Sequence, residues 1–243
     1  MALILYGINR RGLDDSPSLT GLFGNPVRAV EVADFRVIVS DCSIAHVLPG
    51  QTNLADFQAL LQQLTASADV LPMSFGMVAP DEETLRKELL PLRNRLCARL
   101  DAIADRVEFT VRLSWRGENL YSHFFENCSE LRELCRQYLA AGRTPTASER
   151  IHLGQTLQRV LHAERRRCQQ QLIDRLSDLC LDFATAVFDD ERCWAKLALL
   201  VSRAQIDRLR AQAETLPDGA EADLVLELSA PYPPYRFVAL SLE

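Results

Sequence analysis

Apolar residues recur along this chain with two spacings, and each spacing predicts a different kind of element. Alternation is clearest at residues 107–115, where Val107, Phe109, Val111, Leu113 and Trp115 are separated by polar side chains. Because successive side chains of a strand point to opposite faces, this run predicts a half-buried β-strand. Further strands are predicted at residues 3–8, 27–32, 35–39, 183–188, 195–201 and 224–228, and Ala33-Asp34 predicts a tight hairpin between the second and third of these.

Leucines at every third or fourth position predict helices instead. These helices are expected at residues 53–66, 81–103, 127–139 and 206–216, with a long one that begins at Thr146 and continues for about thirty residues. Asp81 is a favourable N-cap, and Pro91 is expected to kink or split the second helix. Thr146 and Glu149 have the spacing of a capping box.

One apolar stretch fits neither spacing. Residues 69–80 read Asp-Val-Leu-Pro-Met-Ser-Phe-Gly-Met-Val-Ala-Pro, and two prolines with Gly76 exclude an ordinary amphipathic helix. The segment is too apolar for a solvated loop, so we expect a short buried connector of β type between two helices. Such a connector marks the centre of the first domain.

The pattern as a whole predicts an α+β protein with two domains, at residues 1–140 and 146–243, joined by a linker at 140–145. Each domain is expected to hold an antiparallel sheet covered by helices. The C-terminal domain reads helix, two strands, helix, strand, which predicts a ferredoxin-like arrangement.

Composition places the chain among ordinary globular proteins, with 48% hydrophobic and 25% charged residues in 243. No apolar run is long enough to predict a transmembrane helix, and the N-terminus reads as a first strand rather than a signal peptide. The seven cysteines include no Cys-x-x-Cys pair, so reduced, mostly buried thiols in the cytosol are expected.

No pattern of catalytic or metal-ligating residues is present. The sequence contains no phosphate-binding loop, no dinucleotide fingerprint and no nucleophile elbow, and its four histidines do not pair at zinc-binding spacing. A Cys–His pair brought together by the fold stays open, while Glu82 and Glu83 are explained by a helix N-terminus. We therefore expect no catalytic residues, no metal and no cofactor.

The net charge of −6 argues against nucleic-acid binding, but charge is unevenly distributed. Residues 143–176 contain seven arginines against three acids, and residues 214–243 contain six acids against Arg236 alone. The basic run is either a solvated helix face or a docking surface for an acidic partner or for the acidic C-terminal part of this chain.

The C-terminal segment Pro231-Tyr232-Pro233-Pro234-Tyr235 cannot form a regular central strand, because proline lacks the amide donor. An extended segment of aromatic residues and prolines is a contact surface for a partner or a strap laid back across the first domain.

Four stretches together span nearly the whole chain: Leu3-Ile4-Leu5-Tyr6-Gly7-Ile8, Leu71-Pro72-Met73-Ser74-Phe75-Gly76, Ile151-His152-Leu153-Gly154, and Pro231-Tyr232-Pro233-Pro234-Tyr235-Arg236-Phe237-Val238. In this order and spacing they resemble the gas vesicle protein family GvpF/GvpL. Ala230 and Tyr232 stand where the family tends to have glycine and tryptophan.

The resemblance implies a minor gas vesicle protein, an accessory or structural factor in vesicle assembly without catalytic activity. Its implied partners are the hydrophobic major shell protein and other gas vesicle accessory proteins, without nucleic acid or membrane lipid. Its implied location is the gas vesicle, with the cytoplasm during assembly. The expected protein-binding residues are Leu71, Pro72, Phe75, Gly76, Pro233, Pro234, Tyr235 and Phe237.

Two other classes remain open from the sequence. Ferredoxin-like domains host many activities, so a cytosolic ligand-binding protein or enzyme is the competing class. The third class is a purely structural component of the vesicle wall, which differs from an assembly factor by its location.

Overall fold

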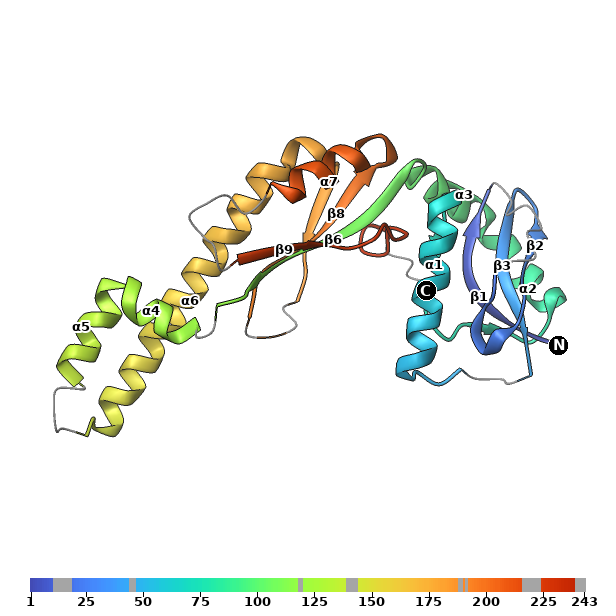
Figure 1. Cartoon of the computed structure of the whole chain (residues 1–243). Coiled ribbons are helices and arrows are strands. Elements are labelled where there is room, and N and C mark those ends of the chain that lie inside the picture. Colours follow the sequence, from blue (N-terminus) through green and yellow to red (C-terminus); the bar gives the residue numbers. More distant parts are fainter. Residues whose placement is uncertain are drawn as a thin grey trace. The chain divides into compact units, whose positions relative to one another are not determined.

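The computed structural model of the chain is an α+β structure (Figure 1). It describes residues 1–10, 19–43, 47–117, 120–138, 144–187, 190, 192–215 and 224–238. Some predicted features lie wholly or partly outside these residues: the linker at 140–145, the helix ends at Leu139 and Leu216, and the strand end at Phe188.

The chain forms two compact units. The first comprises Met1–Phe109, Leu199–Ile206 and Ser229–Glu243, and the second comprises Thr110–Ala198 and Asp207–Leu228. The predicted domains, 1–140 and 146–243, follow the order of the chain, whereas this grouping places C-terminal residues with the N-terminal part.

The first unit is built on a five-stranded antiparallel sheet in the order β2-β3-β1-β4, with β5 also on β1. The hairpin of β2 (Val27–Val32) and β3 (Phe35–Cys42) is confirmed, and Ala33 in its turn has φ 51°. β3 pairs with β1 (Ala2–Asn9). The other edge of β1 pairs with both β4 (Leu71–Pro72) and β5 (Val78–Ala79).

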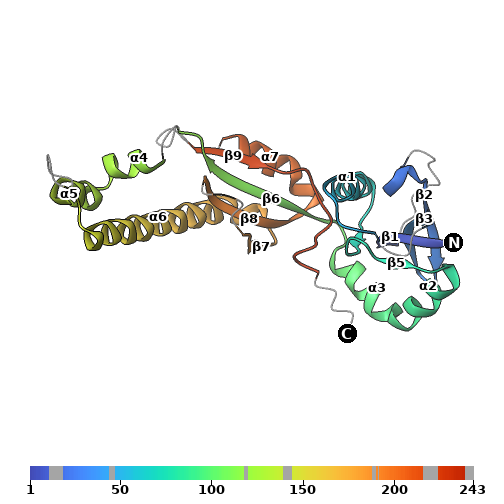
Figure 2. The same cartoon turned by 90° about the horizontal axis from the view of Figure 1, so that it is seen from below.

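Helices cover both faces of this sheet (Figure 2). The residues facing α1 (Gln51–Ser67) form one apolar cluster, and those facing α2 (Glu82–Leu89) and α3 (Arg93–Ala102) form another. Strand alternation divides β1 between the two clusters: Ile4 and Tyr6 pack with α1, whereas Leu3, Leu5 and Ile8 pack with α2 and α3. Burial on both faces explains the continuous apolar runs of these strands.

The predicted helix ends are confirmed in this unit. The Asp81 carboxylate accepts a hydrogen bond from the Thr84 amide at 2.7 Å, which caps α2. Pro91 lies in a single 3₁₀ turn, Leu90–Leu92, that separates α2 from α3. The proline therefore splits the long leucine stripe into two helices that share one face of the sheet.

The second sheet has the order β7-β8-β6-β9. Its strands are β6 (Arg106–Trp115), β7 (Asp182–Thr185), β8 (Cys193–Ser202) and β9 (Leu224–Leu228). β6, which chain order assigned to the first domain, pairs antiparallel with β9, Val111 opposite Leu228 and Trp115 opposite Leu224.

The second unit contains α4 (Leu120–Asn127), α5 (Ser129–Tyr138), α6 (Ala147–Leu176) and most of α7 (Ile206–Glu214). The predicted capping box is present, since the Glu149 amide donates to the Thr146 hydroxyl and the Thr146 amide donates to the Glu149 carboxylate. α6 is 30 residues long, as its pattern predicts. α4 is a helix that the sequence pattern did not predict.

An aromatic cluster explains why α4 folds where it does. The rings of Trp115 and Trp194 stack with centroids 5.7 Å apart, and Phe124 of α4 stacks on Trp194 at the same distance. All three side chains are buried.

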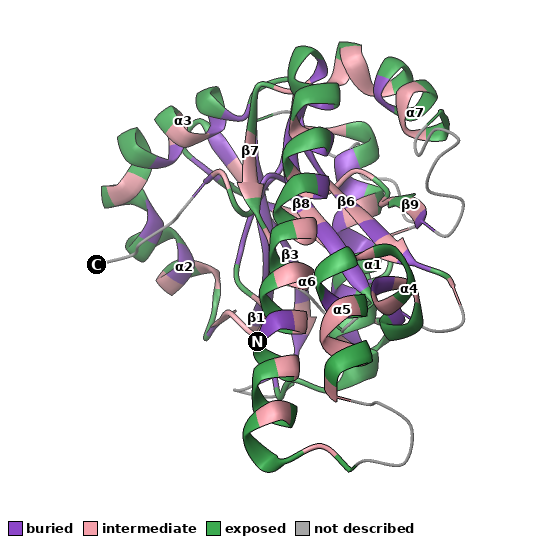
Figure 3. Cartoon of the chain, turned by 90° about the vertical axis from the view of Figure 1, so that its left-hand side faces the viewer, coloured by how far each residue is buried: buried purple, intermediate pink, exposed green. Residues whose placement is uncertain are grey.

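Burial differs between strands and helices along the chain: Figure 3 shows buried strands and largely exposed helices. Among the described helices, none is long and apolar enough to cross a membrane.

Candidate protein-binding site

The connector predicted at residues 69–80 is confirmed, and it runs along the edge of β1 between α1 and α2. Its two short strands pair with opposite ends of β1, Leu71 with Ile8 and Ala79 with Leu3. Between them the chain stays attached through two further bonds: Met73 N to Tyr6 O at 2.9 Å, and Leu5 N to Met77 O at 3.0 Å. The connector therefore protects a strand edge and also presents its own side chains.

Gly76 permits the bend at the centre of the connector. Its φ is +83°, a conformation that residues with a side chain rarely adopt, and a Cβ there would lie 3.3 Å from the carbonyl oxygen of Val47. The bend turns Phe75 toward α1, where its ring meets Phe57 edge-on with centroids 5.3 Å apart. Met73 and Met77 pack with the cluster on the other face of the sheet.

An apolar groove of about 360 Å³ opens between the connector and α2. Its lining residues come from β1, the connector, β5 and the α2 region: Leu5, Met73, Met77, Val78, Ala79, Leu85, Glu88, Leu89 and Leu92. Among its described lining residues, Met77, Val78 and Leu92 are half-buried, and Glu88 is exposed and is the one charged side chain. Thioether side chains adapt to irregular apolar surfaces, so the groove suits a greasy ligand of variable shape.

The C-terminal segment is fastened beside this groove. The Tyr235 hydroxyl donates a hydrogen bond to the Met73 carbonyl oxygen at 2.8 Å, and Val238 is buried in the cluster that contains Met73. Burial raises the pKa of Tyr235. Of the two interpretations of this segment, a strap across the first domain is the one that its contacts match, and residues 229–238 belong to the first unit.

Glu108 of β6 holds the other end of the strap. Its amide and carbonyl pair with the carbonyl and amide of Tyr232, each bond 2.8 Å long. Its carboxylate accepts a hydrogen bond from the Arg236 amide at 2.9 Å and lies 3.6 Å from Nε of the same arginine. Burial raises the pKa of Glu108, and the Arg236 hydrogen bond and charge oppose that shift. Among the described residues, the proline segment thus forms a single isolated β-bridge, as expected where prolines lack amide donors.

The expected protein-binding residues fall into two groups. Four of them are buried and support the conformation of the connector and the C-terminal segment: Leu71, Pro72, Pro233 and Pro234. Phe75, Gly76, Tyr235 and Phe237 are half-buried or exposed and are available for contact. The Tyr235–Met73 bond brings the two motifs together, although 162 positions separate these residues in the chain.

Sequence reasoning missed the accessible part of the groove. Met77 and Val78 lie inside the motif but were assigned only to buried packing, and Leu92 was assigned only to a helical stripe. Their groove position depends on the bend at Gly76 and on the split at Pro91. The signal in the sequence was two of the three methionines placed four residues apart in one connector.

A second and more polar cleft of about 510 Å³ lies in the same unit, at the C-terminal ends of α1 and α3. Both of its arginines form salt bridges with aspartates, Arg203 with Asp69 and Arg10 with Asp101, each with an N–O distance of 3.1 Å. The Asp69 carboxylate also accepts the Asp105 amide at 3.0 Å. Among the described residues, no three or more His, Cys, Asp or Glu side chains are placed together to hold a metal ion.

Comparison with known proteins identifies the family. Residues 2–239 match the model of the family described as gas vesicle synthesis protein GvpL/GvpF. The chain belongs to the GvpL/GvpF family. A GvpL/GvpF relative, gas vesicle protein F of Streptomyces sp. (strain CB03234), is 27% identical over 242 residues, which are 98% of this chain and all of that protein. Gas vesicle protein F of Dolichospermum flosaquae is 25% identical over 159 residues, 64% of each protein.

Two solved structures share the fold of this GvpL/GvpF member. The crystal structure of gas vesicle protein GvpF from Anabaena sp. PCC7120 has a TM-score of 0.80 at 23% identity, covering 99% of this chain and 97% of the other. That of GvpF from Microcystis aeruginosa has a TM-score of 0.75 at 19% identity, covering 98% and 99%. The α+β fold with two antiparallel sheets and helices is therefore the fold of GvpF crystal structures.

Proposed function

We propose that this GvpL/GvpF family member acts in gas vesicle synthesis by binding the hydrophobic major shell protein at the groove beside the connector. The observation that carries the proposal is the groove itself. It is apolar, it has an accessible side at Met77, Val78 and Leu92, and it adjoins the two segments that match the family signature.

The physical role follows from the chemistry of the partner. An apolar shell subunit aggregates in water unless its exposed surface is covered before it reaches the growing vesicle. Each 100 Å² of apolar surface that the groove removes from water contributes about 2.5 kcal/mol before the costs of association. A shallow groove of this kind gives a modest affinity, which suits an assembly factor that must release its cargo.

The remaining expectations are part of the same proposal. The protein works by contact and not by catalysis, without a cofactor, and its partners include other gas vesicle accessory proteins. It acts in the cytoplasm during assembly and at the gas vesicle. No observation favours a second function: in the polar cleft each arginine already has a carboxylate partner.

We also propose that the second sheet is ferredoxin-like. In chain order the elements read β6, helices α4 to α6, β7, β8, α7 and β9, which is the β-α-β-β-α-β sequence of that fold if the three helices count as one crossover. The sheet order β7-β8-β6-β9 supports this, since the crossover from β6 to β7 leaves a gap that β8 fills. The sequence pattern had placed this topology in residues 146–243 alone.

A binding experiment tests the function. Immobilised protein is incubated with the purified major shell protein in mild detergent, and the retained fraction is measured. In a parallel experiment, the gene that encodes this protein is deleted in the native host, and the fraction of floating cells is measured. Retention together with loss of floating cells supports the proposal, whereas absence of binding together with normal vesicles overturns it.

A second experiment separates an assembly factor from a wall component. Purified vesicles are washed with urea and probed with an antibody against this chain. An assembly factor is removed by the wash or is absent, while a structural component of the wall remains. The proposal predicts removal.

A further inference from the structure

The exposed side of α6 is a surface that the proposed function does not use. Between Ala147 and Arg167 the helix buries only Thr156, because α5 packs along one side and the other side stays open. Figure 3 shows α6 as mostly exposed, and Figure 2 shows α5 beside its N-terminal part. The residues that share the open side at helical spacing are Ile151, Gly154, Gln155, Gln158, His162 and Arg166.

No contact among the described residues explains a glycine at position 154. Gly154 lies well inside the 30-residue helix, it is not at a helix end, and a Cβ built there meets nothing within 4 Å. Glycine in a helix interior destabilises the fold by about 0.5–1 kcal/mol relative to alanine. A missing side chain lets another backbone approach closely, so a neighbouring helix at this point would use the gap.

Ile151 stands beside this gap. It is one turn before Gly154, and 61% of its surface is exposed. An exposed isoleucine next to a glycine offers an apolar contact and a recess on the same helix face. This arrangement suits packing of one helix against another, in which a side chain of each helix fills a hole in the other.

From Ala147 to Gln171 the charges that α6 exposes all have one sign, whereas the exposed acid Asp174 lies near the C-terminal end of the helix. Among its exposed residues from Ala147 to Gln171 the charged ones are Arg150, Arg159, Arg166 and Arg167. Glu149 and Glu164 are half-buried, and their carboxylates already accept hydrogen bonds, from the Thr146 amide and from Arg167 respectively. Arg159 pairs with Glu130 of α5, on the side away from Gly154. The whole chain has a net charge of −6, so this positive surface is a local departure.

We propose that the open side of α6 docks an acidic amphipathic helix of another protein. The apolar stripe of that helix would pack on Ile151 and over Gly154, and its carboxylates would face Arg166 and Arg150. A symmetric pairing with a second copy is disfavoured, because it would place the arginines of two α6 helices against each other. Within the described part of the acidic C-terminal segment, Glu227 pairs with Arg112 of β6.

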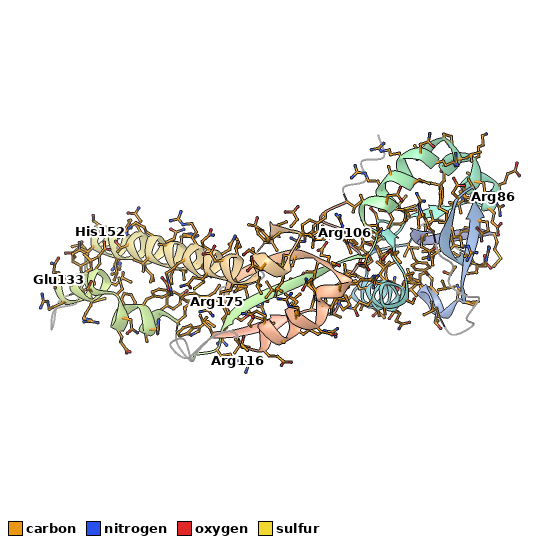
Figure 4. The ribbon with its side chains drawn as sticks, turned by 90° about the horizontal axis from the view of Figure 1, so that it is seen from above. Arg86, Arg106, Arg116, Glu133, His152 and Arg175 are labelled. Carbon is orange, nitrogen blue, oxygen red and sulfur yellow. The ribbon has the colours of Figure 1, made fainter. Side chains whose placement is uncertain are left out.

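The test uses the full chain and two designed helical peptides of about three heptads. The peptides share one leucine stripe and differ only in carrying glutamate or lysine on its flanks. Binding is measured by fluorescence anisotropy for the wild type, Arg166→Glu and Gly154→Leu. The matched controls are Arg116→Glu, an exposed arginine after β6 (Figure 4), and Ala163→Leu, an exposed position on the opposite side of α6.

The proposal predicts that the glutamate peptide binds and the lysine peptide does not. Arg166→Glu weakens binding about fivefold, and Gly154→Leu about tenfold, while both controls bind as the wild type does. Gly154→Leu raises the thermal midpoint, because leucine is the better helix former, so weaker binding cannot come from unfolding.

Other outcomes overturn the proposal. They are no binding of the glutamate peptide, equal binding of both peptides, or binding that the two α6 substitutions leave unchanged. Binding of duplex DNA or of anionic vesicles that depends on Arg166 would assign the surface to a different partner. Self-association of the wild type that Gly154→Leu abolishes would assign it to a second copy of this chain.

Discussion

The Tyr235 hydroxyl lies 2.8 Å from the Met73 carbonyl oxygen and donates a hydrogen bond to it. This bond joins the C-terminal strap to the connector, which are the two segments that carry the family signature. It brings two motifs that lie 162 positions apart in the chain into one site, and the groove opens beside it.

Tyr235→Phe tests the strength of this link. The substitution keeps the ring and removes the hydroxyl, so the free energy of unfolding should fall by about 1 kcal/mol. Equilibrium urea unfolding measures the change, with Tyr232→Phe in the same segment as the control for loss of a hydroxyl. An unchanged stability would show that the strap is not held by this bond.

Glu108 gives the strap a pH dependence of known sign. Burial raises its pKa above the ordinary value of 4.5, so the folded state holds the proton more tightly than the unfolded state does. The contribution of Glu108 to the free energy of unfolding is fully present below pH 4.5. It is lost as the pH rises through the pKa that Glu108 has in the folded state. Glu108→Gln removes this component, and urea unfolding of both proteins from pH 4.5 upward should show the wild type losing stability relative to the variant. Parallel pH profiles would contradict the prediction.

Glu82 has the opposite sign. The hydrogen bond from Arg28, at 2.6 Å, and a second from Arg86 lower its pKa from 4.5. Its contribution is therefore present above pH 4.5 and disappears as pH falls through the folded value. Since the side chains of this ion pair are half-exposed, Glu82→Gln should lower the free energy of unfolding by less than about 1 kcal/mol at neutral pH and leave it unchanged in acid. Glu83→Gln in the same helical turn is the control and should change little; equal losses in both variants would refute a specific role for Glu82.

Two glycines with positive φ separate backbone strain from crowding. Gly24 has φ +75° with open space around a Cβ, whereas Gly76 has φ +83° with the Val47 carbonyl oxygen 3.3 Å away. Gly24→Ala should lower the free energy of unfolding by about 1 kcal/mol, and Gly76→Ala should lower it by about 2 kcal/mol. Thermal unfolding of the two variants measures the difference, and an equal cost would mean that the connector yields at Gly76.

Local patterns in the sequence predicted most of the elements correctly. The hairpin at Ala33, the cap at Asp81, the break at Pro91 and the capping box at Thr146 depend on neighbouring residues, so short windows contain the necessary information. α4 was missed because its helical face is stabilised by stacking of Phe124 on Trp194, a residue 70 positions later.

Long-range pairing could not be predicted in the same way. The alternation at residues 107–115 identifies a strand but not its sheet, and its partner β9 lies more than a hundred residues away. The candidate site has the same limit: Pro233 and Tyr235 suggested a strap, while its attachment to Met73 and Glu108 depends on the fold. The groove was not predicted because Met77 and Leu92 approach each other only across the bend and the helix break.

The central claim is that the groove binds the major shell protein, and one affinity comparison tests it most directly. Met77→Glu places a charge at the accessible part of the groove, and Leu48→Glu adds the same charge at an exposed leucine ahead of α1. Retention of the purified shell protein is measured for both variants and the wild type, after circular dichroism confirms that each is folded. The account predicts that Met77→Glu lowers the affinity about tenfold or more and that Leu48→Glu leaves it unchanged. Equal affinity of all three folded proteins would contradict it.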